Sequence, residues 1–254
     1  MSEPGSIQLI ALDGIPEVGE GDDLAQLIVA AAKAAAIGLD DDDVLVVTQK
    51  VVSKAEGRLI DLATVEPRPW AVEFGTRWRR DPRQVELVLR ESAEIVRLGP
   101  GGLIISRTHH GLVCANAGVD LSNVGTGDAA TLLPVDPDAS ARGIREGIRS
   151  RTGVAPAVIV SDSFGRPWRN GIVNVAIGVA GMEALLDLRG TPDAAGREMK
   201  ATVTAVADQL ASAADLAGGK VAQRPVVVVR GYAWSAGEGG AATLLMDRAA
   251  DLFP

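Results

Sequence analysis

Residues 161–171, with the sequence SDSFGRPWRNG, gather side chains that could hold both a cation and an anion. Asp162 lies between two serines, and a carboxylate beside a hydroxyl suits a hard cation such as Mg²⁺ or Mn²⁺, which takes oxygen ligands. Arg166 and Arg169 suit phosphate, as does the backbone exposed at glycines. The alternative is a polar turn in which Asp162 caps the next element and both arginines are solvated. The residue types alone leave the two interpretations open.

Two further polar clusters follow predicted strands. Residues 48–58 (TQKVVSKAEGR) bring two lysines and an arginine to the end of a strand, where they could meet phosphate oxygens. An exposed amphipathic segment is the alternative for that stretch. In residues 116–125 (NAGVDLSNVG), Asp120 and Asn123 lie three positions apart, close enough to share one ligand.

The elements that must position these clusters are predicted from apolar runs and helix caps. We expect strands at residues 7–12, 44–48, 157–160, 173–179 and 226–229, and a hairpin at 103–114. We expect helices at residues 24–37, at 67–97 in two pieces divided near Pro82, from a cap at 136–138 to 151, at 203–216 and at 241–252. This irregular alternation predicts a mixed α/β arrangement of the α+β class. Residues 1–254 should form a single functional unit, of one body or of two closely packed subdomains.

Composition limits the partners. The net charge of −8 argues against an extended surface for nucleic acid or anionic membrane. The single cysteine, Cys114, excludes an intramolecular disulfide and a cysteine-based zinc site. There is no 18-residue apolar run and no basic N-terminal region followed by an apolar one, so we expect a cytoplasmic protein. A P-loop motif is also missing, so a nucleotide would have to be held by other means.

Four stretches in this order and spacing resemble the coenzyme F420-0:L-glutamate ligase family, the γ-glutamyl ligases of deazaflavin biosynthesis. They are residues 14–18 (GIPEV), 48–58, 117–123 (AGVDLSN) and 161–171, and the resemblance extends from residue 7 to residue 253. It implies a family-specific α+β fold, built as an intertwined homodimer. Actinobacterial relatives continue into a C-terminal flavin reductase domain, so we expect this chain to correspond to the ligase domain alone.

The resemblance also implies a reaction. The family adds L-glutamate to the phospholactyl carboxylate of F420-0, or of its dehydro form, with GTP as co-substrate and GDP and phosphate as products. It uses Mg²⁺ or Mn²⁺, and we expect two ions, with K⁺ as a further candidate. Expected GTP contacts, position by position, are Ile15, Pro16, Glu17, Val18, Gln49, Lys54 and Asn123.

The metal-ligand positions of the family match Asp120, Asp162 and Ser163, and Arg166 and Arg169 are candidates for holding the phosphodiester of the substrate. Lys220 joins these substrate-binding candidates, although archaeal members carry Gln or Glu there, and a charged lysine cannot bind a metal. No residue stands out as a general base.

Two other functions remain open on the sequence. The same aspartates would serve a metal-dependent phosphohydrolase with water as the acceptor. A nucleotide- or deazaflavin-binding module without activity is the non-enzymatic alternative.

Overall fold

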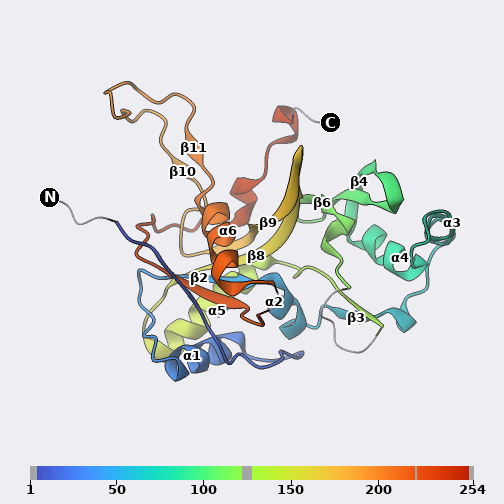
Figure 1. Ribbon diagram of the computed structural model, residues 1–254, viewed down its shortest axis with the longest axis horizontal. Helices are drawn as coiled ribbons and strands as arrows, with labels where there is room; N and C mark the ends of the chain where they lie inside the picture. Colours follow the sequence, from blue (N-terminus) through green and yellow to red (C-terminus); the bar gives the residue numbers. More distant parts are fainter. Residues whose placement is uncertain (1–4, 122–127, 221, 252–254) are drawn as a thin grey trace.

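The structure, a computed structural model, describes residues 5–121, 128–220 and 222–251, and its centre is a mixed five-stranded sheet (Figure 1). In spatial order its strands are β1 (Gln8–Ala11), β12 (Val226–Arg230), β2 (Val44–Thr48), β8 (Ala157–Arg166) and β9 (Arg169–Ala180). β2 and β8 run parallel, whereas the other neighbours are antiparallel. The strands expected at residues 7–12, 44–48 and 226–229 are confirmed.

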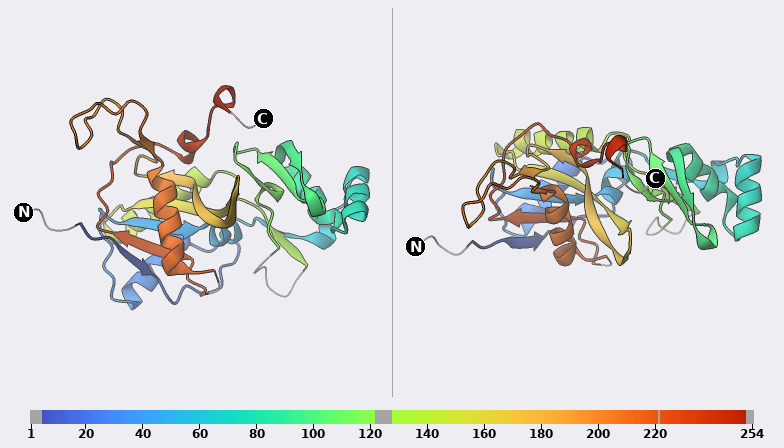
Figure 2. Two further views of the ribbon diagram at one scale, coloured as in Figure 1. Left: turned by 45° about the horizontal axis from the view of Figure 1, so that its top comes forward. Right: turned by 90° about the horizontal axis from the view of Figure 1, so that it is seen from above.

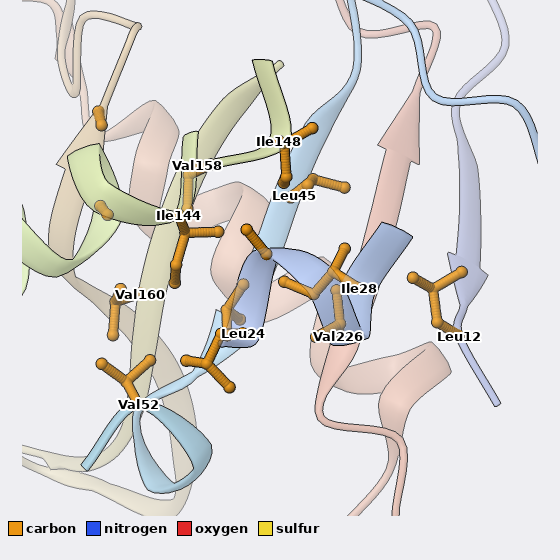
Figure 3. Packing of buried hydrophobic residues seen from close by; sticks show 14 of the residues in the cluster. Leu12, Leu24, Ile28, Leu45, Val52, Ile144, Ile148, Val158, Val160 and Val226 are labelled. Atoms are coloured by element: carbon orange, nitrogen blue, oxygen red, sulfur yellow. The ribbon is translucent and has the colours of Figure 1, made fainter. Parts of the chain in front are cut away.

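Helices cover both faces of this sheet, which is why its central strands are continuous apolar runs. Alternate residues of β2, such as Leu45 and Val47, face α1 (Leu24–Ala34) and α5 (Pro137–Thr152). Val44 and Val46 face α6 (Val206–Gly218) on the other side. Figure 3 shows the first of these two cores, with Leu24 and Ile28 packed toward Leu45, and the right panel of Figure 2 shows the layers.

Aspartate side chains cap the first turns of α1 and α5, and the cap at residues 136–138 was predicted. The Asp23 carboxylate accepts a hydrogen bond of 2.9 Å from the Gln26 N–H, and Asp136 accepts one of 2.8 Å from the Ala139 N–H. Each cap satisfies a backbone donor that has no partner within its helix. These caps place α1 and α5 against the sheet from their first turn.

A second lobe lies beside the sheet, on the right of Figure 1, and has its own apolar core around Phe74, Val85 and Ile104. It contains α3 (Pro69–Trp78), α4 (Pro82–Glu91), β4 (Ser92–Leu98), β5 (Ile104–Thr108), β6 (Val113–Ala115), β3 (Leu59–Asp61) and β7 (Ala129–Thr131). The predicted hairpin and the helix division at Pro82 are confirmed. Helix was expected as far as residue 97, which is wrong, because the chain pairs with β5 from Ser92 onward.

The last predicted helix is also wrong. In place of a helix over residues 241–252, the described residues form the short 3-10 turns Ala241–Leu244 and Arg248–Ala250. Met246 is 63% exposed, and Ala241 is the buried residue of the first turn. Leu244 packs against one core of the sheet and Leu245 against the other, and both are only partly buried, so a continuous helix here would gain little packing.

A two-stranded hairpin, β10 (Leu186–Asp187) and β11 (Val203–Thr204), projects from the body at the upper left of Figure 1. Together the strands, helices and lobes make an α+β fold, as predicted. Among the described residues no helix has both the length and the apolar character needed to cross a membrane.

Candidate functional site

The predicted cation site lies inside a strand and not at the end of one. β8 was expected to end at residue 160, but it continues to Arg166 and returns as β9, so Asp162 pairs with Val175. The parallel pairing with β2 does end near residue 160, at Thr48 and Ser161. Asp162 is therefore the first residue beyond the rim that β2 and β8 share. It begins no helix, which contradicts the interpretation of Asp162 as a cap in a polar turn.

Asp120 approaches the same rim from the second lobe. It follows β6 and the 3-10 turn Asn116–Gly118, and two backbone hydrogen bonds with Thr131, of 3.0 and 2.8 Å, fix its backbone. The Lys50 Nζ, on the short helix α2 (Gln49–Ala55), lies 2.8 Å from the Asp120 Oδ2. This ion pair joins the end of β2 to the lobe.

The charge of Asp120 acts on the carboxyl group of Asp162. Part of the Asp162 residue is exposed to solvent, but protein atoms surround its carboxyl group on most sides. Burial raises the pKa of Asp162 to about 6, and the charge of Asp120 adds to the rise. A hydrogen bond from the Ser163 N–H and the charges of Lys220 and Lys50 oppose it. Burial, and then the charge of Asp162, raise the pKa of the Cys114 thiol on β6 to about 12, so β6 also borders this rim.

Ser163 belongs to a hydrogen-bonded group on the neighbouring strand. Its Oγ donates to the Asn174 Oδ1 over 2.7 Å, and Asn174 on β9 is only 4% exposed. The Lys220 Nζ donates to the same Asn174 oxygen over 2.9 Å and also to the Ser163 Oγ. The predicted metal ligand Ser163 therefore already contacts a lysine ammonium group.

The predicted nucleotide segments converge at α2. The Lys54 side chain is largely buried, and its Nζ forms an ion pair with the Oε1 of Glu17, which belongs to residues 15–18. The side chain of Glu17 is exposed. Gln49 has a structural role, because its Nε2 donates to the Ser53 Oγ over 2.8 Å and to the Leu132 carbonyl over 3.3 Å. Of the expected GTP contacts, residues 15–18 and Lys54 are brought together, and Asn123 lies outside the described residues.

The two candidate arginines lie farther along the hairpin. Arg166 and Arg169 lie opposite each other in the strand register at the hairpin tip. The Arg166 Nη2 donates a hydrogen bond of 3.2 Å to the Asn170 carbonyl. Arg166 lies three residues beyond Ser163 along β8, and a β-strand rises about 3.3 Å per residue. The structure thus places both arginines at the hairpin tip, beyond the rim where the aspartates lie.

Sequence reasoning missed two residues of this site. Lys50 was one of the two lysines of residues 48–58 that could meet phosphate oxygens, but its ion pair with Asp120 was not foreseen. Asn174 lies within a largely apolar strand, and only the hairpin register that sets it opposite Ser163 reveals it.

The donor atoms at this rim suit Mg²⁺ or Mn²⁺. Two carboxylates and a hydroxyl offer hard oxygen ligands, and these cations commonly bind one or two carboxylates together with substrate phosphates and water. Over the ranges that the structure describes, no three His, Cys, Asp or Glu side chains converge into a cage formed by the protein alone. The residues therefore fit an ion that arrives with a phosphate group, and Asp120 and Asp162 would hold it.

Comparison with known proteins gives one consistent answer. The sequence profile of a family described as F420-0:Gamma-glutamyl ligase matches residues 14–231. A coenzyme F420:L-glutamate ligase from Methanothermobacter thermautotrophicus is 46% identical over 250 residues, which cover 97% of this chain and 98% of the relative. A protein of the same name from Methanocaldococcus jannaschii is 40% identical over 255 residues, covering 100% and 99%. Another, from Methanopyrus kandleri, is 46% identical over 231 residues, or 89% of each chain. The chain belongs to the F420-0:gamma-glutamyl ligase family.

Proposed function

We propose that this protein adds L-glutamate to the phospholactyl carboxylate of F420-0, or of its dehydro form, in a reaction driven by GTP. The observation that carries the proposal is the pair of interacting carboxylates, Asp120 and Asp162, at a rim that the lysines of α2 also reach. The names of the relatives, which specify F420 and L-glutamate, support the choice of substrates.

The chemistry requires activation of the acceptor. A carboxylate does not react with an amine at neutral pH, so it must first become an acyl phosphate, with GDP as the leaving group; glutamate nitrogen then displaces phosphate. Phosphoryl transfer depends on alignment and charge neutralisation more than on covalent help from the protein. Asp120 and Asp162 would hold Mg²⁺ or Mn²⁺, which supplies charge neutralisation for the phosphate oxygens.

The remaining residues bind and orient. Lys54, released from Glu17 by competition, would contact a phosphate as a point charge, while residues 15–18 contact the nucleotide. A bound cation would favour the ionised form of Asp162, because its positive charge would oppose the effects of burial and of the Asp120 charge. Arg166 and Arg169 stay candidates for the phosphodiester of the acceptor.

We also propose that the protein acts as a homodimer in the cytoplasm. The lobe supports association, because β4 is an edge strand of its sheet and exposes Ile95, Val96 and Leu98. An exposed apolar edge strand is ready to pair with another chain.

The test of the activity is direct. The protein is incubated with F420-0, L-glutamate, GTP and Mn²⁺, and mass spectrometry follows the acceptor. A glutamate adduct with one phosphate released per adduct is expected. Phosphate release without adduct would replace the proposal with a phosphohydrolase, and binding without turnover would replace it with a binding module. The control is Lys33→Gln, an exposed lysine at the end of α1, which should leave the rate unchanged.

A further inference from the structure

Lys220 reaches the candidate site from outside the segments that form it. It follows the C-terminus of α6, where the cap residue Gly219 has a φ of +67°, a backbone conformation that favours glycine. This turn carries the chain from α6 toward the β8–β9 hairpin. The side chain of Lys220 is 47% exposed, so burial does not force it into its position.

The ammonium group of Lys220 is matched to oxygen atoms. It donates to the Ser163 Oγ and to the Asn174 Oδ1, 2.9 Å away, and its Nζ lies 3.4 Å from the Asp215 Oδ1. An ammonium group has three N–H donors, and here three side-chain oxygens surround it. A hydroxyl, an amide and a carboxylate oxygen are also the ligands that a hard cation would select.

A second divalent ion at this position would have to displace the lysine. Two cations sharing the Ser163 oxygen would lie only a few ångströms apart, where repulsion is strong beside a partly buried strand. The Lys220 ammonium group also contacts Ser163, the residue that directly follows Asp162 in β8. The lysine thus already supplies a positive charge beside Asp162.

We infer that Lys220 is a built-in cation that takes the place of a second divalent ion at Ser163, so that the protein binds one divalent ion per protomer, held by Asp120 and Asp162. This inference rests on the proposed function, since it concerns the cations that accompany GTP. It makes Lys220 a positioning residue, which fixes Ser163 and Asn174 and supplies charge beside the reacting phosphates. The expectation of two metal ions is replaced by one ion and one ammonium group.

The test counts bound Mn²⁺ by equilibrium dialysis with a saturating non-hydrolysable GTP analogue. Its second readout is electron paramagnetic resonance, which detects coupling between neighbouring Mn²⁺ ions. Wild type should bind one ion per protomer and give an uncoupled spectrum. Lys220→Gln, which removes the charge and supplies an oxygen ligand, should bind two and show coupling. The matched control is Lys200→Gln, an exposed lysine between β10 and β11, which should behave as wild type.

Each outcome separates the possibilities. Two coupled ions in wild type, or one ion in Lys220→Gln, would overturn the role of Lys220 even if ligation proceeds. No Mn²⁺ bound by wild type with the analogue would contradict the metal assignment of the proposed function as well. If Lys220→Gln does not fold, as judged by circular dichroism, Lys220→Met keeps the length of the stem and removes the charge. Lys220→Met is then expected to bind a second Mn²⁺ ion weakly. If it binds no second ion, the inference is overturned.

Discussion

Two carboxylates, Asp120 and Asp162, lie with two lysines, Lys50 and Lys220, at the rim of the central sheet. Lys50 pairs with Asp120, and both Lys50 and Lys220 act on Asp162. Like charges held close together repel, and here the lysines offset part of that repulsion until a cation binds.

Replacing Asp162 by asparagine should therefore stabilise the metal-free protein at neutral pH. The pKa of Asp162 is about 6 in the folded protein and about 3.9 when unfolded, so the charged form costs folding free energy above pH 6. That cost disappears as the pH falls from about 6 to about 4. Asp162→Asn should gain about 1–3 kcal/mol at pH 7.5, and the gain should shrink at pH 5. Thermal unfolding at both pH values measures it.

The same variant separates a site from a structural role. Mn²⁺ should raise the melting temperature of wild type by mass action and raise that of Asp162→Asn little. A variant that loses about 0.5–2 kcal/mol at pH 7.5 and keeps the full Mn²⁺ response would show that Asp162 is only structural.

Lys54→Ala should weaken GTP binding more than it affects folding. The lysine is 8% exposed and directed at Glu17, and a lost charge-assisted contact to phosphate costs about 1.5–3 kcal/mol. Calorimetry should show affinity reduced about ten- to hundredfold, with Lys33→Ala as the exposed control. Unchanged affinity in a folded variant would remove Lys54 from the nucleotide site.

At the scale of elements, extension of β8 past Ser161 brings Asp162 and Ser163 to the site. The sequence predicts the apolar first half of this strand, because Ala157 to Val160 is buried on both faces. The polar second half of β8 resembles a loop in sequence, and only its pairing with β9 makes it a strand. Pairing also explains β4, where helix was expected as far as residue 97: antiparallel pairing with β5 overrides the local preference of this segment.

α4 provides a test of the lobe that is independent of the site. Glu86 is 3% exposed and accepts hydrogen bonds of 2.9 Å from the side chains of Arg68 and Arg90. Burial alone would raise the pKa of Glu86, but the hydrogen bonds outweigh it and lower the pKa to about 2. The stability that Glu86 adds is thus fully present above about pH 4.5 and is lost as the pH falls toward 2.

Glu86→Gln should lose about 1–3 kcal/mol in urea unfolding at pH 7. The difference from wild type should narrow at pH 3, because below about pH 4.5 the unfolded chain binds a proton at Glu86 that the native carboxylate, with a pKa of about 2, largely does not. Glu73→Gln, on the exposed side of α3, should change stability by less than about 0.5 kcal/mol at either pH. Equal losses for both variants would contradict the buried pair.

At the scale of the whole molecule, the sequence is informative about local structure and poor about assembly of the site. Buried runs such as that of β2 and caps such as Asp136 depend on neighbouring residues, so they can be recognised directly. The contact of Lys50 with Asp120 joins residues 70 positions apart, and no local pattern encodes it. The resemblance to a family brought the two aspartates into one hypothesis, whereas their interaction at one rim emerges only from the fold.

The whole molecule should also be a dimer. The exposed apolar residues of β4 include Ile95 and Leu98, and association would remove them from water. Sedimentation equilibrium should give the mass of two chains at micromolar concentration. A stable folded monomer in that range would contradict the dimer.

The central claim, activation of a carboxylate by phosphoryl transfer, is tested most directly by isotope transfer. F420-0 with heavy oxygen in both positions of its phospholactyl carboxylate is incubated with GTP, L-glutamate and Mn²⁺, and the phosphate released is analysed by mass spectrometry. An acyl phosphate transfers one carboxylate oxygen to phosphate, so each adduct should be matched by one phosphate carrying a single heavy oxygen. Phosphate that carries only solvent oxygen would mean that water, and not the acceptor carboxylate, receives the phosphoryl group.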